Sequence, residues 1–175
     1  MTEEAWKKLR NFYLDELDLK GRPITAKMEM IEPVLMFTVD NWVSFLKDHY
    51  RTKDNPVYCR VHCITLGKHK KGSYHTRDGK GRAFDGHVVG VSLHDMFTTA
   101  LMFGFGGVGV YFYTPEHSDP DMIVHNPYIH VDVRPWNKGR AVVWYRENGK
   151  YEYDPRKVME RITRTDATIP FPYLR

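Results

Sequence analysis

Four side chains of metal-binding types lie in loop-like or apolar segments of the chain: His75, Asp85, His130 and Asp132. Neutral imidazole and carboxylate groups are good ligands for Zn²⁺, and a catalytic zinc site uses three protein ligands and a water molecule. Asp85 lies in the apolar segment 83–89, where a carboxylate is costly unless it is paired or bound to a metal. These groups indicate a metal site, with hydrogen-bonded structural residues as the alternative.

The pair His130 and Asp132 allows several interpretations. Residues two apart in a strand share one face. Asp132 could therefore lie beside His130 at the metal site, or it could form an ion pair with Arg134. The same His-x-Asp spacing opens the two-histidine, one-carboxylate motif of iron enzymes. That motif needs a further histidine downstream, and none follows His130. Iron is therefore the weaker alternative to zinc.

The two cysteines, Cys59 and Cys63, are predicted to be reduced thiols. Four residues of extended strand separate them by roughly 13 Å, whereas a disulfide needs Cα atoms within about 7 Å. A metal site made of Cys59, His62 and Cys63 is disfavoured because His62 would point to the opposite face of that strand.

The segment Gly104–Gly109 fits the pattern G-x-G-x-x-G of dinucleotide-binding proteins. That motif must follow a strand and open a helix. Here a helical pattern precedes it and a strand pattern follows, so the glycines are interpreted as a helix end and a tight entry into a strand.

The length and composition favour one folded domain over residues 1–175. The chain is 42% hydrophobic and 14% aromatic, and its net charge is +4. This mild positive charge suits nucleic acid, a membrane surface or a wall polymer and selects none of them. No apolar stretch approaches 18 residues, so no membrane span is expected. The charged N-terminus lacks an apolar core, so no secretory signal is predicted.

Hydrophobic periodicity predicts an α+β domain in which helices pack on a mainly antiparallel sheet. Helices are expected over residues 3–19, in a segment capped by Asp40, and in a segment that begins at Ser92 and ends at Gly104. A short helix is expected in the tail 154–175. Strands are expected over residues 57–66, 82–91, 107–112, 128–133 and 141–146.

The order of these residues resembles the zinc D-Ala-D-Ala carboxypeptidase and L-alanyl-D-glutamate endopeptidase family, whose fold is shared with the hedgehog signalling domain. The family pattern S-x-H-x-x-G-x-A-x-D is matched in order by Ser73, His75, Gly81, Ala83 and Asp85. The segments 106–111 and 130–132 match the G-G-V-G-x-Y and H-V-D segments of its murein endopeptidase branch. The resemblance covers about residues 35–135. The loop from His75 to Gly81 is three residues longer than is usual in the family, and Pro127 stands where many members have a carboxylate.

The resemblance implies a zinc peptidase that hydrolyses peptide bonds in bacterial peptidoglycan, of the endolysin or carboxypeptidase type. It implies His75, Asp85 and His130 as zinc ligands. We expect Asp132 to be the general base, with His125 as the second candidate. Ser73, Arg82 and His87 are expected to support the ligands or bind substrate.

The expected partner is a peptidoglycan peptide, without nucleic acid or a membrane span. A phage lysin released by a holin would need no signal peptide, so the expected location is cytoplasmic until release, with action on the cell wall. The alternative function is a non-catalytic binding or virion-structural protein that keeps the same fold.

Overall fold

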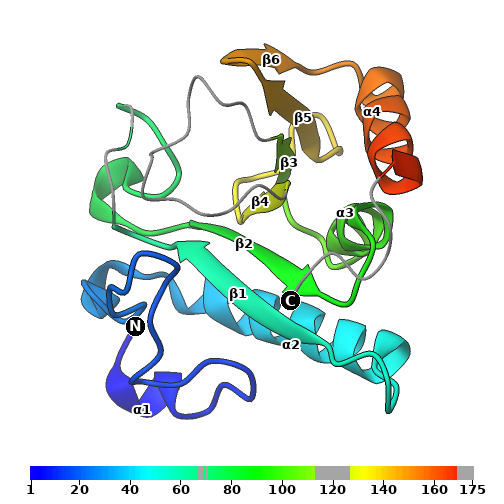
Figure 1. Ribbon diagram of the computed structural model, residues 1–175. Helices are drawn as coiled ribbons and strands as arrows, with labels where there is room; N and C mark the ends of the chain where they lie inside the picture. The colour runs from blue at the N-terminus through cyan, green and yellow to red at the C-terminus, as the bar shows by residue number, and fades with distance from the viewer. Residues whose placement is uncertain (67–68, 70, 113–126, 169–175) are drawn as a thin grey trace.

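The computed structural model describes residues 1–66, 69, 71–112 and 127–168, and it has an α+β fold (Figure 1). The helices are α1 (Glu3–Trp6), α2 (Pro33–Tyr50), α3 (Leu93–Met102) and α4 (Pro155–Thr168). The strands are β1 (Tyr58–Cys63), β2 (Ala83–Val89), β3 (Gly107–Tyr111), β4 (Tyr128–Asp132), β5 (Val142–Glu147) and β6 (Lys150–Glu152). None of the helices in the described ranges is long and apolar enough to cross a membrane.

The six strands form one mixed sheet in the order β1-β2-β4-β3-β5-β6. Strands β3 and β5 run parallel, whereas the other neighbouring pairs are antiparallel. The expectation of a mainly antiparallel sheet is therefore corrected to a mixed one. The parallel pair arises because the chain leaves β4 and enters β5 beside the start of β3, where the Val142 amide donates a hydrogen bond to the Gly106 carbonyl at 2.8 Å.

The two faces of the sheet have different surroundings. Phe84, Val88, Ile129, Val131 and Val108 alternate along their strands and belong to the hydrophobic core. Helices α2, α3 and α4 contact the strands that carry this face. The residues between them in sequence, including Asp85 and His130, project from the other face, so the sheet separates the core from the candidate site.

The N-terminal region differs most from the sequence prediction. The helix expected over residues 3–19 ends at Trp6, and the chain then runs irregularly to α2. Asp40 does not cap a helix, because α2 begins at Pro33 and contains Asp40 in its interior. Instead its buried carboxylate accepts hydrogen bonds from the backbone amides of Arg10 and Asn11, each at 2.9 Å. That tertiary contact satisfies backbone donors that a helix would have used internally.

The start and end of α3 confirm the capping prediction. The Ser92 hydroxyl accepts a hydrogen bond from the Asp95 amide at 3.0 Å. After the helix, Gly104 takes a φ of +81°, the left-handed conformation that glycine adopts without strain. The glycine-rich segment then enters β3, as predicted, rather than opening a helix.

Candidate metal centre

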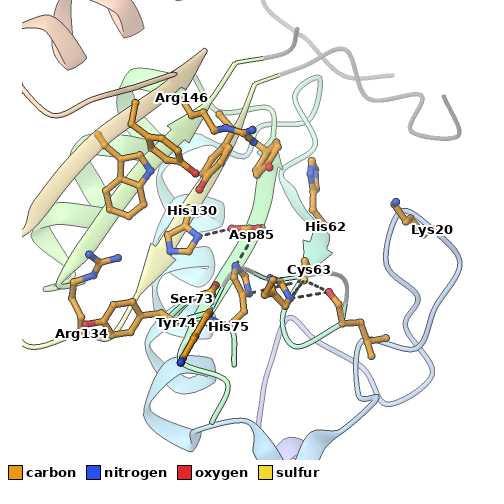
Figure 2. A pocket seen from close by; sticks show the side chains of 18 of the residues that line it. Lys20, His62, Cys63, Ser73, Tyr74, His75, Asp85, His130, Arg134 and Arg146 are labelled. Atoms are coloured by element: carbon orange, nitrogen blue, oxygen red, sulfur yellow. Dashed lines mark hydrogen bonds and ion pairs between the residues drawn. The ribbon is translucent and has the colours of Figure 1, made fainter. Parts of the chain in front are cut away.

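The register of the sheet brings two predicted ligands together. Asp85 on β2 lies directly opposite His130 on β4, and residues opposite each other in an antiparallel pair project from the same face. His75 reaches the same place from the loop between β1 and β2 (Figure 2). That loop is fixed next to β2 because the Arg82 amide donates to the Tyr74 carbonyl at 2.8 Å.

The three side chains form one group around the Asp85 carboxylate. Asp85 Oδ1 lies 2.7 Å from His130 Nδ1, and Asp85 Oδ2 lies 3.2 Å from His75 Nε2. The ligand atoms of all three residues lie within 4.8 Å of one another. Ligand atoms bound to a tetrahedral zinc at about 2.0–2.2 Å lie roughly 3.3 Å apart, so the arrangement can hold a metal ion after small movements.

Each imidazole uses its second ring nitrogen for a different contact. His75 Nδ1 lies 2.6 Å from the Ile64 carbonyl oxygen, and His130 Nε2 lies 3.0 Å from Asp132 Oδ2. Metal-binding histidines usually donate their other N–H to a carbonyl or carboxylate, which fixes the ring and its tautomer. Both rings are therefore oriented with the remaining nitrogen towards Asp85.

The charge of Asp85 dominates the electrostatics of this group. Burial opposes the charged form of each histidine, but the neighbouring carboxylate raises the pKa of His75 to about 10 and that of His130 to about 9. Burial would raise the pKa of Asp85, yet the two histidines hold it well below its usual range. The group thus favours a negative carboxylate between two cations, and a divalent cation could replace the two protons.

Asp132 lies behind His130. Its side chain is fully buried, and the Arg134 guanidinium pairs with both carboxylate oxygens. Burial raises the pKa of Asp132, whereas the hydrogen bonds from His130 and Arg134 lower it below the usual value. Arg134 is itself held over the rings of Tyr74 and Trp144, with its guanidinium carbon 4.3 Å and 5.0 Å from their centroids.

The candidate centre opens into a cavity of about 640 Å³ on the open face of the sheet. Asp85, His75 and His130 line it together with aromatic residues from β3, β4, β5 and the segment after β5. At β3, Gly109 leaves room for the Trp144 ring, because a Cβ at this glycine would lie 2.2 Å from that ring. The glycine therefore lets the Trp144 ring approach His130, with the ring centroids 5.2 Å apart and the planes tilted by 53°.

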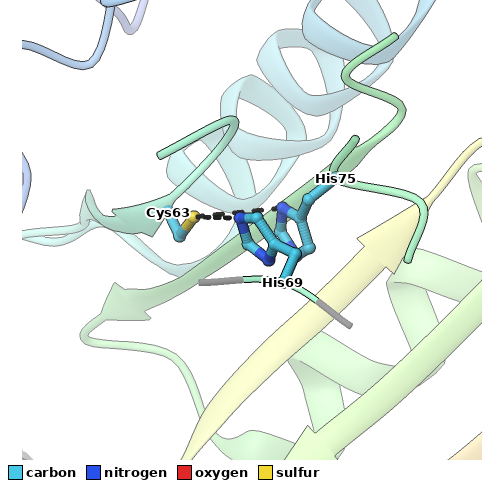
Figure 3. Close-up of side chains that lie close together, drawn as sticks. All are labelled: Cys63, His69 and His75. Atoms are coloured by element: carbon cyan, nitrogen blue, oxygen red, sulfur yellow. Dashed lines mark hydrogen bonds between the residues drawn. The ribbon is translucent and has the colours of Figure 1, made fainter. Parts of the chain in front are cut away.

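A second group of possible ligands shares His75 with the first (Figure 3). Cys63 Sγ lies 3.7 Å from His69 Nε2 and 4.0 Å from His75 Nδ1. The rings of His69 and His75 stack at 4.5 Å. Because His75 Nδ1 already contacts the Ile64 carbonyl, this nitrogen is less available for a metal than the Nε2 atom that faces Asp85.

Cys59 and Cys63 are both free thiols, which confirms the absence of a disulfide between them. Burial raises the pKa of the Cys59 thiol. The strand prediction for this region is confirmed for residues 58–63, with an irregular register between Val61 and Cys63.

The remaining predicted site residues lie in different places. Ser73 lines the cavity, and its hydroxyl lies 3.4 Å from the His75 amide. Arg82 is not part of the cavity lining and forms an ion pair with Glu32 at 3.2 Å, at the start of α2. His125 lies outside the described residues.

His87 belongs to a buried histidine pair next to the candidate centre. Its Nδ1 atom lies 2.6 Å from His62 Nε2, and the outer nitrogens of both rings are buried without a hydrogen-bond partner. Burial lowers the pKa of His62 to about 4 and that of His87 to about 3. His87 therefore contacts another histidine rather than Asp85.

Several residues of the site were not expected from the sequence. They are His62, Cys63, His69, Tyr74, Tyr111, Trp144 and Arg146. Trp144 and Arg146 alternate in a strand that was predicted, but their place next to the candidate metal ligands depends on the parallel pairing of β3 and β5. Alternation assigns residues to a face and leaves the order of strands open.

No protein-family model, curated protein or solved structure matches the chain. The interpretation of the site therefore rests on its geometry and chemistry.

Proposed function

We propose that the protein is a zinc-dependent peptidase that hydrolyses peptide bonds of bacterial peptidoglycan, as an endolysin or a murein endopeptidase or carboxypeptidase does. The observation that carries the proposal is the convergence of His75, Asp85 and His130 at one wall of an open cavity. Two imidazoles and one carboxylate form a ligand set typical of catalytic zinc, with a further position for water. The peptidoglycan substrate rests on the resemblance of the sequence motifs.

The ligand residues form ion pairs with one another and also have the types and spacing to hold a divalent cation. Two histidines share one buried carboxylate, and each is oriented by an outer partner. A bound zinc ion would polarise the scissile carbonyl and lower the pKa of a bound water. The protein would hold the ion through His75 Nε2, the Asp85 carboxylate and His130 Nδ1.

Asp132 has a positioning role in this proposal rather than the role of general base. Its two oxygens are occupied by His130 and Arg134, and its side chain has no exposed surface. A general base must come within hydrogen-bonding reach of the water. Asp132 instead accepts the hydrogen bond from His130 Nε2 and so keeps His130 Nδ1 directed at the ligand group.

The cavity supplies the space for a peptide next to the ligands. Tyr74 and Trp144 hold Arg134, and Tyr111 lies 6.3 Å from the His130 ring. These rings form a rigid wall that would orient an extended substrate and exclude water from one side of the site.

The test is release of peptides and new amino groups from purified peptidoglycan. The wild-type protein with zinc should cleave it, whereas His75→Ala and the chelated protein should not, and added zinc should restore only the chelated wild type. His94→Ala, which changes an exposed histidine on α3, is the matched control and should retain activity. A zinc-loaded wild type that releases nothing would contradict hydrolysis and favour a non-catalytic binding protein.

A further inference from the structure

Arg146 on β5 lies in the cavity with its positive charge unpaired by any carboxylate among the described residues. Its guanidinium carbon lies 6.0 Å from the centroid of the Tyr111 ring and 5.7 Å from that of Tyr151. Both tyrosines are its register partners on the neighbouring strands β3 and β6. The two ring centroids are 6.4 Å apart, so the guanidinium lies beside both rings on the open face of the sheet, where Figure 2 shows Arg146.

The guanidinium of Arg146 has a buried N–H group for which the described residues provide no hydrogen-bond acceptor. Its Nε atom is buried and has no hydrogen-bond acceptor. Aromatic faces attract a cation but do not accept the strong planar hydrogen bonds that a guanidinium can donate. A carboxylate is the group whose geometry matches this fork of N–H donors.

The wider lining of the cavity also favours an anionic ligand. It contains five basic side chains, namely Lys20, Arg22, Lys71, Arg134 and Arg146, of which Arg22 is paired with Asp18 and Arg134 with Asp132. Asp85 is the single acidic residue of that lining among the described residues, and it belongs to the candidate metal centre. A substrate carboxylate would therefore be attracted to Arg146, which has no carboxylate partner among the described residues.

The register fixes the backbone separation of Arg146 from the candidate metal ligands. His130 on β4 is opposite Gly109 on β3, and Arg146 on β5 is opposite Tyr111, two residues further along β3. Two strand spacings and one two-residue step correspond to about 12 Å. Because an extended peptide advances about 3.3 Å per residue, this span equals roughly three to four residues.

We propose that Arg146 is a carboxylate-binding residue that selects peptides with an acidic group about three to four residues from the scissile bond. This inference rests on the proposed peptidase function, since it places the scissile bond at His75, Asp85 and His130. Tyr111 and Tyr151 lie beside the guanidinium and limit its freedom, so less side-chain entropy is lost when it binds one end of the substrate.

The experiment compares two forms of one peptidoglycan stem peptide, the first with free carboxylates and the second with those carboxylates converted to amides. Stopped-flow tryptophan fluorescence gives the dissociation constant of each peptide before turnover, because Trp144 lines the cavity. Wild-type protein should bind the free-carboxylate peptide about 10- to 100-fold more tightly than the amide. Arg146→Met should reduce this ratio to about twofold or less, and Arg146→Lys should give an intermediate ratio because it keeps the charge without the fork.

The matched control is Arg60→Met, which changes an exposed arginine on β1 that also lies over a tyrosine ring but outside the cavity. It should leave the wild-type ratio unchanged. A wild-type ratio near one, or a ratio that survives Arg146→Met, would overturn the proposal. If Arg146→Met does not fold, Arg146→Lys replaces it in the test. A ratio of dissociation constants in Arg146→Lys equal to that of the wild type would then overturn the proposal.

The same preparations separate the two proposals. If both peptides are cleaved and their dissociation constants are equal, the peptidase function is supported and the role of Arg146 is contradicted. Carboxylate-dependent binding that needs Arg146, without any cleavage, would establish the binding site and contradict the peptidase.

Discussion

Two histidine pairs lie side by side on the open face of the sheet, and their charges differ. His75 and His130 surround Asp85, which raises their pKa values to about 10 and 9. His62 and His87 contact each other, and burial lowers their pKa values to about 4 and 3. All four side chains are buried, so burial alone does not decide whether the pKa of a histidine is raised or lowered.

The carboxylate is the decisive difference between the two pairs. Without a carboxylate partner, a buried imidazole loses hydration when it is charged and stays neutral. Next to Asp85 the same ring gains more from the opposite charge than it loses by burial. A cluster of histidines is therefore a candidate metal centre when a buried anion joins it, and the pair of His62 and His87 lacks such an anion in its contacts.

The largest effect on metal affinity and on the histidine pKa values is expected from Asp85→Asn, which removes the negative charge between His75 and His130. Metal affinity should fall by more than about 100-fold, the upper range for loss of an outer partner alone. The pKa values of His75 and His130 should fall, with the larger fall at His75, because Asp132 still favours the charged form of His130. Elemental analysis and NMR titration of the histidine C–H signals measure both effects.

Cys63→Ser is the matched control for this variant, since Cys63 lies opposite Asp85 in the sheet. It should retain the metal and the raised pKa values. Loss of metal in Cys63→Ser with retention in Asp85→Asn would instead assign the metal to Cys63, His69 and His75.

Metal affinity should depend steeply on pH. With pKa values of about 10 and 9, both histidines are protonated near neutral pH in the metal-free protein, and binding must displace both protons. Affinity should therefore fall by up to about 100-fold for each pH unit lowered below about pH 8. Calorimetry in buffers of different ionisation enthalpy should show release of close to two protons, and release of none would contradict these charges.

Asp132→Asn should weaken metal binding by about 10- to 100-fold, because it removes the partner that orients His130. Competition with a chelating dye measures this change. A general base would give another result, with metal affinity retained and turnover reduced by about 10² to 10⁴. Comparing the metal-saturated variant with the wild type distinguishes the two roles of Asp132.

The smallest effect concerns the pair of His62 and His87. Their folded pKa values lie below the unfolded value of about 6.5, so the stability that they contribute is fully present above that pH. It is lost as the pH falls from about 6.5 towards 4 and 3. In the double variant His62→Gln and His87→Gln, the loss of unfolding free energy between pH 7 and pH 5 should shrink by about 3–4 kcal/mol.

Urea unfolding at the two pH values measures this difference. His94→Gln is a suitable control because His94 is exposed. An unchanged loss of stability in the double variant would show that the two rings are not held neutral.

The sequence predicted the parts of the site that depend on local pattern. Alternation located the strands of Asp85 and His130, and the Ser92 cap located α3. These predictions held because the buried face of each strand and the helix cap are set by near neighbours in sequence.

The predictions that failed depended on distant contacts. Asp40 was expected to start a helix, but its carboxylate binds the backbone of residues 10 and 11, some 30 positions away. The parallel pairing of β3 and β5 places Trp144 and Arg146 in the cavity, and no local pattern specifies a strand order. For Asp132 the sequence left two places open, beside His130 or in an ion pair with Arg134, and the structure has both contacts.

The most direct test of the metal centre is anomalous X-ray scattering at the zinc absorption edge from crystals of the protein as isolated. We expect one peak per chain, with His75 Nε2, an Asp85 oxygen and His130 Nδ1 at about 2.0–2.2 Å from it. A peak bound by Cys63 and His69 without Asp85, or no peak at this place in zinc-loaded crystals, would contradict the assignment.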